Sequence, residues 1–287
     1  MLARTGLYAE SWNVAWRKKG KGSILTDKET PFQVIPNSFR YWAADPFFFE
    51  YQGEVYIFAE LFDYIRRRGT LGYCKLGPNG AGKWKKVIEE DYHLSYPFIR
   101  QDGKDIYIIP ESGAARDLHV YKAKQFPDQW EKCQTIRKDV VYGDTTPFRW
   151  QDRQMALTYD VADDYRLLLI DLDHPERDME IAGEANIQRP AGGIFHYDGR
   201  VIRPAQNCVH DYGEGLVFNQ ITFDGNQNYR ETELQGIIPE NLRFSQEIIR
   251  DGIHTYNATD EYEVIDIKTR RFNILNLVFR ILNKLGV

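Results

Sequence analysis

The sequence has few cysteines and no long uninterrupted run of apolar residues. Its 287 residues include three cysteines, Cys74, Cys133 and Cys208. An odd number of widely separated cysteines predicts neither a disulfide framework nor a zinc-binding motif, so we expect buried thiols in a reducing compartment. No segment reaches the roughly 20 apolar residues that a membrane-spanning helix needs, and residues 1–22 lack the apolar stretch of a secretory signal. These absences favour a cytoplasmic protein.

An excess of basic residues is missing as well. The 37 Lys and Arg residues are outnumbered by 42 Asp and Glu residues, for a net charge of -5. Because nucleic-acid phosphates require a basic face, we predict no nucleic-acid partner. The segment "GPNGAGK" at 77–83 lacks the spacing and the hydroxyl residue of a phosphate-binding loop, and we interpret it as a turn. The "DLD" at 171–173 is too common a pattern to indicate a metal site. The sequence therefore indicates neither a metal site nor a cofactor, and it does not predict whether the protein depends on magnesium.

Aromatic side chains are plentiful, and many of them lie in an internal repeat. The segments "DPFFFEYQGEVYIFAE" from Asp45, "YPFIRQDGKDIYIIPE" from Tyr96 and "DTTPFRWQDRQMALTYD" from Asp144 share a Pro-Phe near the start, a polar turn and a second strand that ends in an acid. A fourth copy that keeps the hairpin begins at Arg189, and a weaker fifth copy begins at Gly252. Four short strands in each repeat of about 40 to 50 residues are typical of a propeller blade.

This period predicts an all-β, five-bladed β-propeller as a single domain over residues 1–272. Residues 1–40 form an N-terminal extension in this prediction, and a strand within it completes the last blade and covers its open edge. A two-sheet sandwich is the competing fold, but it does not explain so regular a period. Apolar residues recur at helical spacing in 273–287, which predicts a C-terminal amphipathic helix. That helix docks on the domain or a partner subunit, or else lies in a membrane interface.

The repeat also predicts which side chains meet at one end of the propeller axis. Inner strands line the central channel, and second strands run back antiparallel, so the first residues of the former lie near the last residues of the latter. The residues placed there are Asp45, Tyr96, Asp144, Arg189 and His254 from inner strands, and Glu60, Glu111, Asp160, Arg203 and Gln206 from second strands. Each of them also has a structural interpretation, as a turn cap, an ion-pair partner or, for His254, a hydrogen-bonded imidazole.

Several carboxyl groups beside an arginine and a histidine suit chemistry at an acetal carbon. Carboxyls that share one concave site have separated pKa values, so one can give a proton while another accepts one. We predict Asp45, Glu111 and Asp144 as catalytic residues. The predicted substrate-binding residues are Glu60, Tyr96, Asp160, Arg189, Arg203 and His254. The partner would be a sugar or glycan, and the sequence does not predict an oligomeric state.

The same motifs carry a resemblance to known families. "AADPFFF", "YPFI…IYIIPES" and "DTTPF" resemble the propeller of glycoside hydrolase family 43. With "RPAGGIF", "RPAQNC" and "GIHTYN", the chain more closely resembles the N-terminal domain of plant glucosamine inositolphosphorylceramide transferase and its free-standing bacterial relatives. The family 43 resemblance implies an inverting mechanism with Asp45 as general base and Asp144 as the carboxylate that tunes pKa values and orients the sugar. The glutamate expected as general acid has no match near 203–206, and Glu111 is its substitute from an earlier blade.

Three functions remain open at this point. The first is a cytoplasmic carbohydrate-active enzyme that transfers a glycosyl group in surface polysaccharide or glycolipid assembly. It would be peripheral at the inner face of the membrane if its C-terminal helix lies in the membrane interface. The second is an inverting hydrolase of the family 43 type. The third is a glycan-binding propeller without catalytic activity, in which the acids only hold hydroxyl groups.

Overall fold

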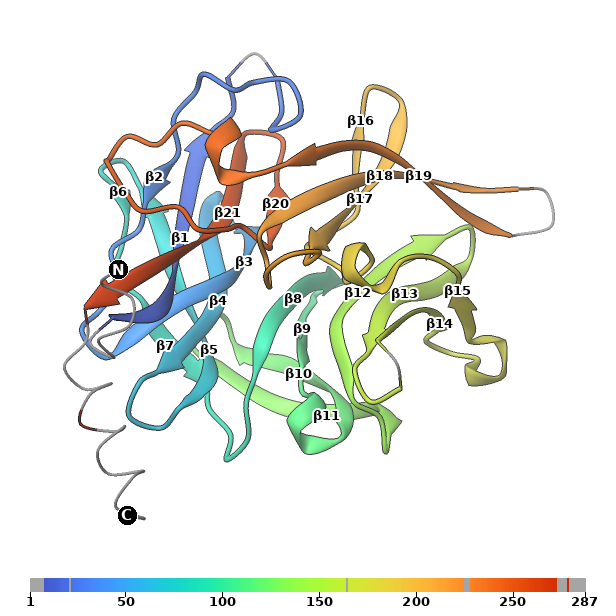
Figure 1. Ribbon diagram of the computed structural model, residues 1–287. Coiled ribbons are helices and arrows are strands. Elements are labelled where there is room, and N and C mark those ends of the chain that lie inside the picture. Colours follow the sequence, from blue (N-terminus) through green and yellow to red (C-terminus); the bar gives the residue numbers. More distant parts are fainter. Residues whose placement is uncertain (1–7, 21, 164, 225–227, 273–277, 279–287) are drawn as a thin grey trace.

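The computed structural model describes residues 8–20, 22–163, 165–224, 228–272 and 278, and it shows five antiparallel sheets arranged around a central axis (Figure 1). The predicted five-bladed β-propeller is therefore confirmed, and the sandwich alternative is excluded. Apart from Val278, the helical elements of the described residues are short 3-10 turns: η2 (Gly113–Ala115), η3 (Pro175–Arg177), η4 (Ala185–Ile187) and η5 (Pro239–Asn241). No helix in the described part of the chain is long and apolar enough to cross a bilayer.

The strands follow the predicted repeat. The first sheet contains β3 (Tyr41–Tyr51), β4 (Glu54–Asp63), β5 (Arg68–Gly77), β6 (Gly80–Ala81) and β7 (Lys85–Ile88). The second contains β8 (Ser95–Asp102), β9 (Asp105–Glu111), β10 (Asp117–Gln125) and β11 (Gln129–Lys138), and the third contains β12 (Tyr142–Trp150), β13 (Arg153–Asp160), β14 (Arg166–Asp171) and β15 (Met179–Ile181). The fourth contains β16 (Phe195–Tyr197), β17 (Arg200–Asn207), β18 (Gly215–Phe223) and β19 (Tyr229–Ile237).

The fifth sheet joins the two ends of the described chain. It contains β20 (Tyr256–Ala258), β21 (Tyr262–Phe272), β1 (Tyr8–Lys18) and β2 (Gln33–Val34). Strand β1 pairs with β21 along its whole length, so an N-terminal strand completes the last blade, as the sequence predicts. A buried ion pair lies across this junction, with Arg17 Nη2 2.6 Å from Glu263 Oε2.

Apolar side chains fill the spaces between neighbouring blades. Five clusters of buried residues are present among the described residues, and each contains residues from two adjacent sheets. Phe47 and Phe58 of the first sheet, for example, pack with Tyr96 and Ile108 of the second. The alternation of strand side chains accounts for this arrangement, because each sheet buries both of its faces against its neighbours.

Three inner strands contain a β-bulge at corresponding positions. The bulged residues Asp45, Tyr96 and Asp144 have φ angles of 51°, 45° and 49°. Each lies at a shift in the register of its strand with the next one. We predicted that these residues open their strands, but β3, β8 and β12 begin earlier, so the residues lie within the strands. The extra residue of a bulge bends the strand and re-aims the side chain, which explains how a mid-strand residue faces the channel.

The predicted amphipathic helix at 273–287 lies outside the described residues, apart from Val278. Its contact with a membrane, the domain or another subunit therefore stays a prediction.

Candidate active site

Asp45 lies at one end of the central axis, an end that we call the mouth. The residue is 5% exposed. One carboxyl oxygen, Oδ2, accepts a hydrogen bond from the backbone N–H of Tyr96 at 3.2 Å, and the other, Oδ1, accepts one from the Thr255 hydroxyl at 2.9 Å. Burial raises the pKa of Asp45 to about 6, although the positive charge of His254 lowers it. Asp45 is therefore mostly ionised at neutral pH and still close to its titration range.

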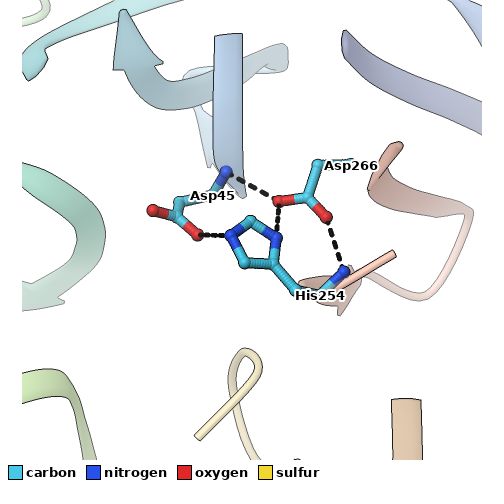
Figure 2. Close-up of side chains that lie close together, drawn as sticks. All are labelled: Asp45, His254 and Asp266. Carbon is cyan, nitrogen blue, oxygen red and sulfur yellow. Dashed lines mark hydrogen bonds and ion pairs between the residues drawn. The ribbon is translucent and has the colours of Figure 1, made fainter. Parts of the chain in front are cut away.

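His254 lies between two carboxyl groups, as Figure 2 shows. Its Nδ1 is 2.6 Å from Asp266 Oδ2, and its Nε2 is 3.5 Å from Asp45 Oδ1. Burial lowers the pKa of His254, but the charges of Asp266 and Asp45 outweigh this effect and raise the pKa above its usual value. Asp266 also accepts a backbone hydrogen bond from Asp45 at 3.0 Å and from His254 and Thr255 at 2.9 Å.

These three side chains are also the best candidates for holding a cation among the described residues. One ligand atom from each of Asp45, His254 and Asp266 lies within 4.8 Å of the others. A protonated imidazole, however, has no lone pair to offer a metal. In the arrangement seen here the ring nitrogens face carboxylate oxygens, as they do in an ion-pair network.

Asp144 holds a second group of charges beside the first. Its Oδ2 accepts hydrogen bonds from Arg189 Nε at 2.5 Å and from Gln206 Nε2 at 2.8 Å. Arg189 Nη2 also donates to Glu111 Oε2 at 3.1 Å, and the same oxygen accepts the backbone N–H of Asp144 at 3.2 Å. Burial raises the pKa of Asp144 to about 6, while Arg189 lowers it. Arg189 thus bridges the two acids that the sequence places in adjacent blades.

Tyr96 and Glu60 lie at the same end but differ in their contacts. The Tyr96 hydroxyl is 2.7 Å from Thr146 Oγ1 and accepts the backbone N–H of Gly192 at 2.7 Å. Because Tyr96 is completely buried, it braces neighbouring blades and offers no open ring face to a sugar. Glu60 is 4% exposed. Burial, and then the charges of Asp45 and other acids, raise the pKa of Glu60 well above its usual value.

Two predicted substrate-binding residues have other partners. Asp160 Oδ1 accepts the backbone N–H groups of Ala162 and Asp163 at 3.0 and 3.3 Å, so this carboxylate caps the turn after β13. Arg203 is fully buried and donates to Glu231 Oε1 at 2.6 Å. Successive side chains of a strand point to opposite faces, and an odd number of positions separates Arg203 from Gln206. Arg203 therefore lies on the face of β17 opposite to Gln206. The structure therefore does not bring Asp160 or Arg203 into contact with the acids of the mouth.

Other residues at the mouth were not among the predicted site residues. Trp12 of β1 stacks on His254 with ring centroids 4.0 Å apart, and the ring of Tyr212 meets His254 edge-on at 5.4 Å. Tyr212 also lines a pocket of about 230 Å³ that includes Arg189, Cys208, Tyr159 and Tyr165. The sequence did contain a signal for Asp266, because it lies on the second strand of the weakest repeat. Trp12 precedes the first repeat, and no periodic signal marks it.

Comparison with known sequences supports the predicted resemblance. The family model described as the N-terminal part of glucosamine inositolphosphorylceramide transferase 1 matches residues 21–162. The Arabidopsis thaliana protein of that name is 27% identical over 255 residues, which cover 82% of this chain and 31% of that protein. The chain spans about a third of the length of the curated relatives that it matches. The chain is thus similar in sequence to part of these transferases.

Solved structures with a similar fold are glycoside hydrolases. An α-L-arabinofuranosidase from Podospora anserina in complex with cellotriose aligns with a TM-score of 0.58 and 12% identity, covering 85% of this chain and 83% of that one. A family 43 β-xylosidase/α-arabinofuranosidase from a compost microbial metagenome, in complex with xylotriose, aligns with a TM-score of 0.52 and 12% identity, covering 81% and 91%. At this identity the likeness shows a shared propeller fold and no shared activity.

Proposed function

We propose that this propeller is a carbohydrate-active enzyme that transfers a glycosyl group in the assembly of a surface polysaccharide or glycolipid, on the cytoplasmic side of the membrane. Its relatives are named as transferases, and its fold is shared with glycoside hydrolases. The proposal depends chiefly on one observation. Acidic side chains from separate blades meet at the mouth, and burial raises the pKa values of Asp45 and Asp144 to about 6.

In this proposal Asp45 is the general base. A base works best when its pKa lies near the working pH, and burial moves the pKa of Asp45 towards that range. The Thr255 hydroxyl and the Tyr96 backbone N–H fix the direction of its carboxylate. Asp45 would take the proton of the acceptor hydroxyl as that oxygen attacks the sugar carbon. The ionised form that does this is favoured by the His254 imidazolium nearby.

Asp144 and Arg189 would hold the sugar. Asp144 has one oxygen, Oδ2, engaged by Arg189 and Gln206. Its partner Arg189 also lines the neighbouring tyrosine-rich pocket, where aromatic faces suit sugar rings. Arg189 already bridges Asp144 and Glu111, so we expect it to hold neutral hydroxyl groups and not a further anion.

The same bridge supports a second candidate, a glycan-binding propeller without catalysis. Asp144 and Glu111 both hold Arg189, which leaves them less free for proton transfer. The chain also spans only part of its relatives, so their transfer activity need not lie in the part that matches. In this alternative the acids and tyrosines of the mouth would bind sugar hydroxyls only.

One assay separates these functions. The purified full chain is incubated with nucleotide-activated sugars, with and without an inositol phospholipid acceptor, and with aryl glycosides alone. We expect product only when the acceptor is present. Asp45→Asn should lower turnover by about 10²- to 10⁴-fold, the usual contribution of a general base. Asp152→Asn, which alters a fully exposed carboxylate, is the matched control and should leave turnover unchanged.

Other outcomes point elsewhere. Release of sugar from aryl glycosides without an acceptor would support hydrolysis. Saturable sugar binding with no product from any donor would support the glycan-binding candidate. Unchanged turnover in Asp45→Asn would contradict the assignment of the base.

A further inference from the structure

The mouth contains more carboxyl groups than cations. Five acids lie there, with Arg189 and His254 as the positive partners seen in the contacts above: Asp45, Glu60, Glu111, Asp144 and Asp266. Four of these acids raise the pKa of the fifth, Glu60, through their charges, which shows that they act on one another. Several uncompensated charges cannot be buried together, so one carboxyl must keep its proton.

The hydrogen bonds indicate which carboxyl is neutral. Asp45, Glu111, Asp144 and Asp266 each accept at least one hydrogen bond from a backbone N–H or a side-chain donor. Glu60 accepts none from the described residues, and its Oε1 is enclosed without a hydrogen-bond partner there. A carboxylate gains most from donors and cations, and a neutral carboxyl loses least without them. Glu60 is therefore the acid best suited to stay protonated.

The neighbouring His93 determines which Glu60 oxygen carries the proton. Its Nδ1 accepts the backbone N–H of Gly69 at 2.9 Å, so in the neutral ring the hydrogen is on Nε2. Burial lowers the pKa of His93, which favours this neutral form. Nε2 of His93 lies 3.5 Å from Glu60 Oε1, at the outer limit of a hydrogen bond. A hydrogen on Oε1 would meet the hydrogen of Nε2, so the proton of a neutral Glu60 is better placed on Oε2.

We propose that Glu60 is the proton donor of this site and that His93 is its positioning residue. This inference deepens the proposed function and depends on it. As the bond between the sugar carbon and the leaving oxygen breaks, its electron pair stays on that oxygen, which takes the proton from Glu60 Oε2. Asp45 accepts the proton of the attacking hydroxyl in the same reaction. Both carboxyls return to their starting states by exchanging protons with water after the products leave.

The assignment replaces Glu111 as the candidate acid. Glu111 Oε2 accepts hydrogen bonds from Arg189 and from the Asp144 backbone, and both donors favour a carboxylate over a carboxylic acid. Glu60 comes from the first blade, directly opposite Ala44 in the β3–β4 pair and so next to the proposed base. Base and acid would thus come from adjacent strands of one blade.

The first test needs no substrate. Infrared spectroscopy detects the carbonyl stretch of a protonated carboxyl, and at about pH 8 the carboxyls with a pKa of about 6 are ionised. We expect this band in the unaltered protein and in Glu111→Gln, and we expect Glu60→Gln to lose it. A band that survives Glu60→Gln, or that disappears in Glu111→Gln, would overturn the proposal. Glutamine has the shape of the neutral acid, so Glu60→Gln should fold.

The second test uses activity. With aryl glycosides or activated sugars, Glu60→Gln should lose about 10²- to 10⁴-fold in turnover with a poor leaving group and far less with a good one that needs no proton. His93→Gln should also lower turnover more with the poor leaving group than with the good one, but by a smaller factor than Glu60→Gln. Equal losses on both leaving groups would refute the donor role. If the unaltered protein turns over no substrate while the infrared band behaves as expected, the proposed function fails but the protonation of Glu60 does not.

Discussion

Asp45→Asn should become more stable relative to the unaltered protein as the pH rises, even though it removes the proposed base. Asp45 has its backbone in the left-handed region, with φ at 51°, and asparagine tolerates this conformation well. The substitution therefore changes charge and hydrogen bonding with little backbone strain. Its effect on the free energy of unfolding should depend on pH, because the pKa of Asp45 is raised in the folded protein.

The expected change in the free energy of unfolding follows from the raised pKa of Asp45. Burial raises the pKa of Asp45 from 3.8 to about 6, so between these values the folded state binds more protons than the unfolded state. The contribution of Asp45 to the stability of the unaltered protein should therefore fall as the pH rises from about 4 to about 6, and stay level above this range. Each pKa unit corresponds to about 1.4 kcal/mol, so the loss due to Asp45 is about 3 kcal/mol.

Urea unfolding of both proteins at several pH values measures this difference. The stability of Asp45→Asn relative to the unaltered protein should increase by about 3 kcal/mol between pH 4 and pH 8. A constant offset is expected from the lost hydrogen bond to Thr255 or Tyr96, and only the change with pH tests the reasoning. Asp152→Asn removes the same charge from an exposed side chain and controls for net charge. A difference in stability that stays constant or shrinks as the pH rises would contradict a raised pKa for Asp45 in the folded protein.

Two further substitutions test the surroundings of the site. Gly69→Ala would place a Cβ 2.3 Å from Glu60 Oε1 and 2.4 Å from the Leu94 carbonyl oxygen. We therefore expect urea unfolding to show a loss of about 1–3 kcal/mol in stability. Gly77→Ala on the same strand has room for the Cβ and should change the stability little. Arg17→Met leaves Glu263 buried without its cation and should lower the free energy of unfolding by about 3–5 kcal/mol. The double variant Arg17→Met/Glu263→Gln should restore part of this loss. An unchanged urea midpoint in Arg17→Met would contradict a stabilising role for this ion pair.

The fold was largely predictable because the chain repeats the same pattern. The Pro-Phe motifs after Asp45 and Tyr96, and the acids that end the paired strands, marked the blades and their common end. The N-terminal strand that completes the fifth sheet also followed from the need to cover an open edge. Periodicity of this kind places residues of separate blades in the same ring, which is why Asp45, Asp144 and Glu60 were correctly brought to one end.

Contacts between blades were less predictable. Arg203 follows the repeat in sequence, but its strand alternation turns it towards Glu231. Asp266 and His93 were missed because one lies in the weakest repeat and the other in a connecting segment. The bulge at Asp45 could not be predicted either, because a single extra residue does not change the hydrophobic pattern recognisably. Such details depend on which donors surround each side chain in space.

The pairing of β1 with β21 has a consequence for how the molecule forms during synthesis. Residues 8–18 must wait for residues 262–272 to leave the ribosome before their hydrogen bonds can form. Until then β1 can pair only with the short strand β2, and its other edge has no partner. We therefore expect the last steps of folding to be slow, since they join segments from distant parts of the chain. Chaperones that shield unpaired strand edges should bind this late intermediate.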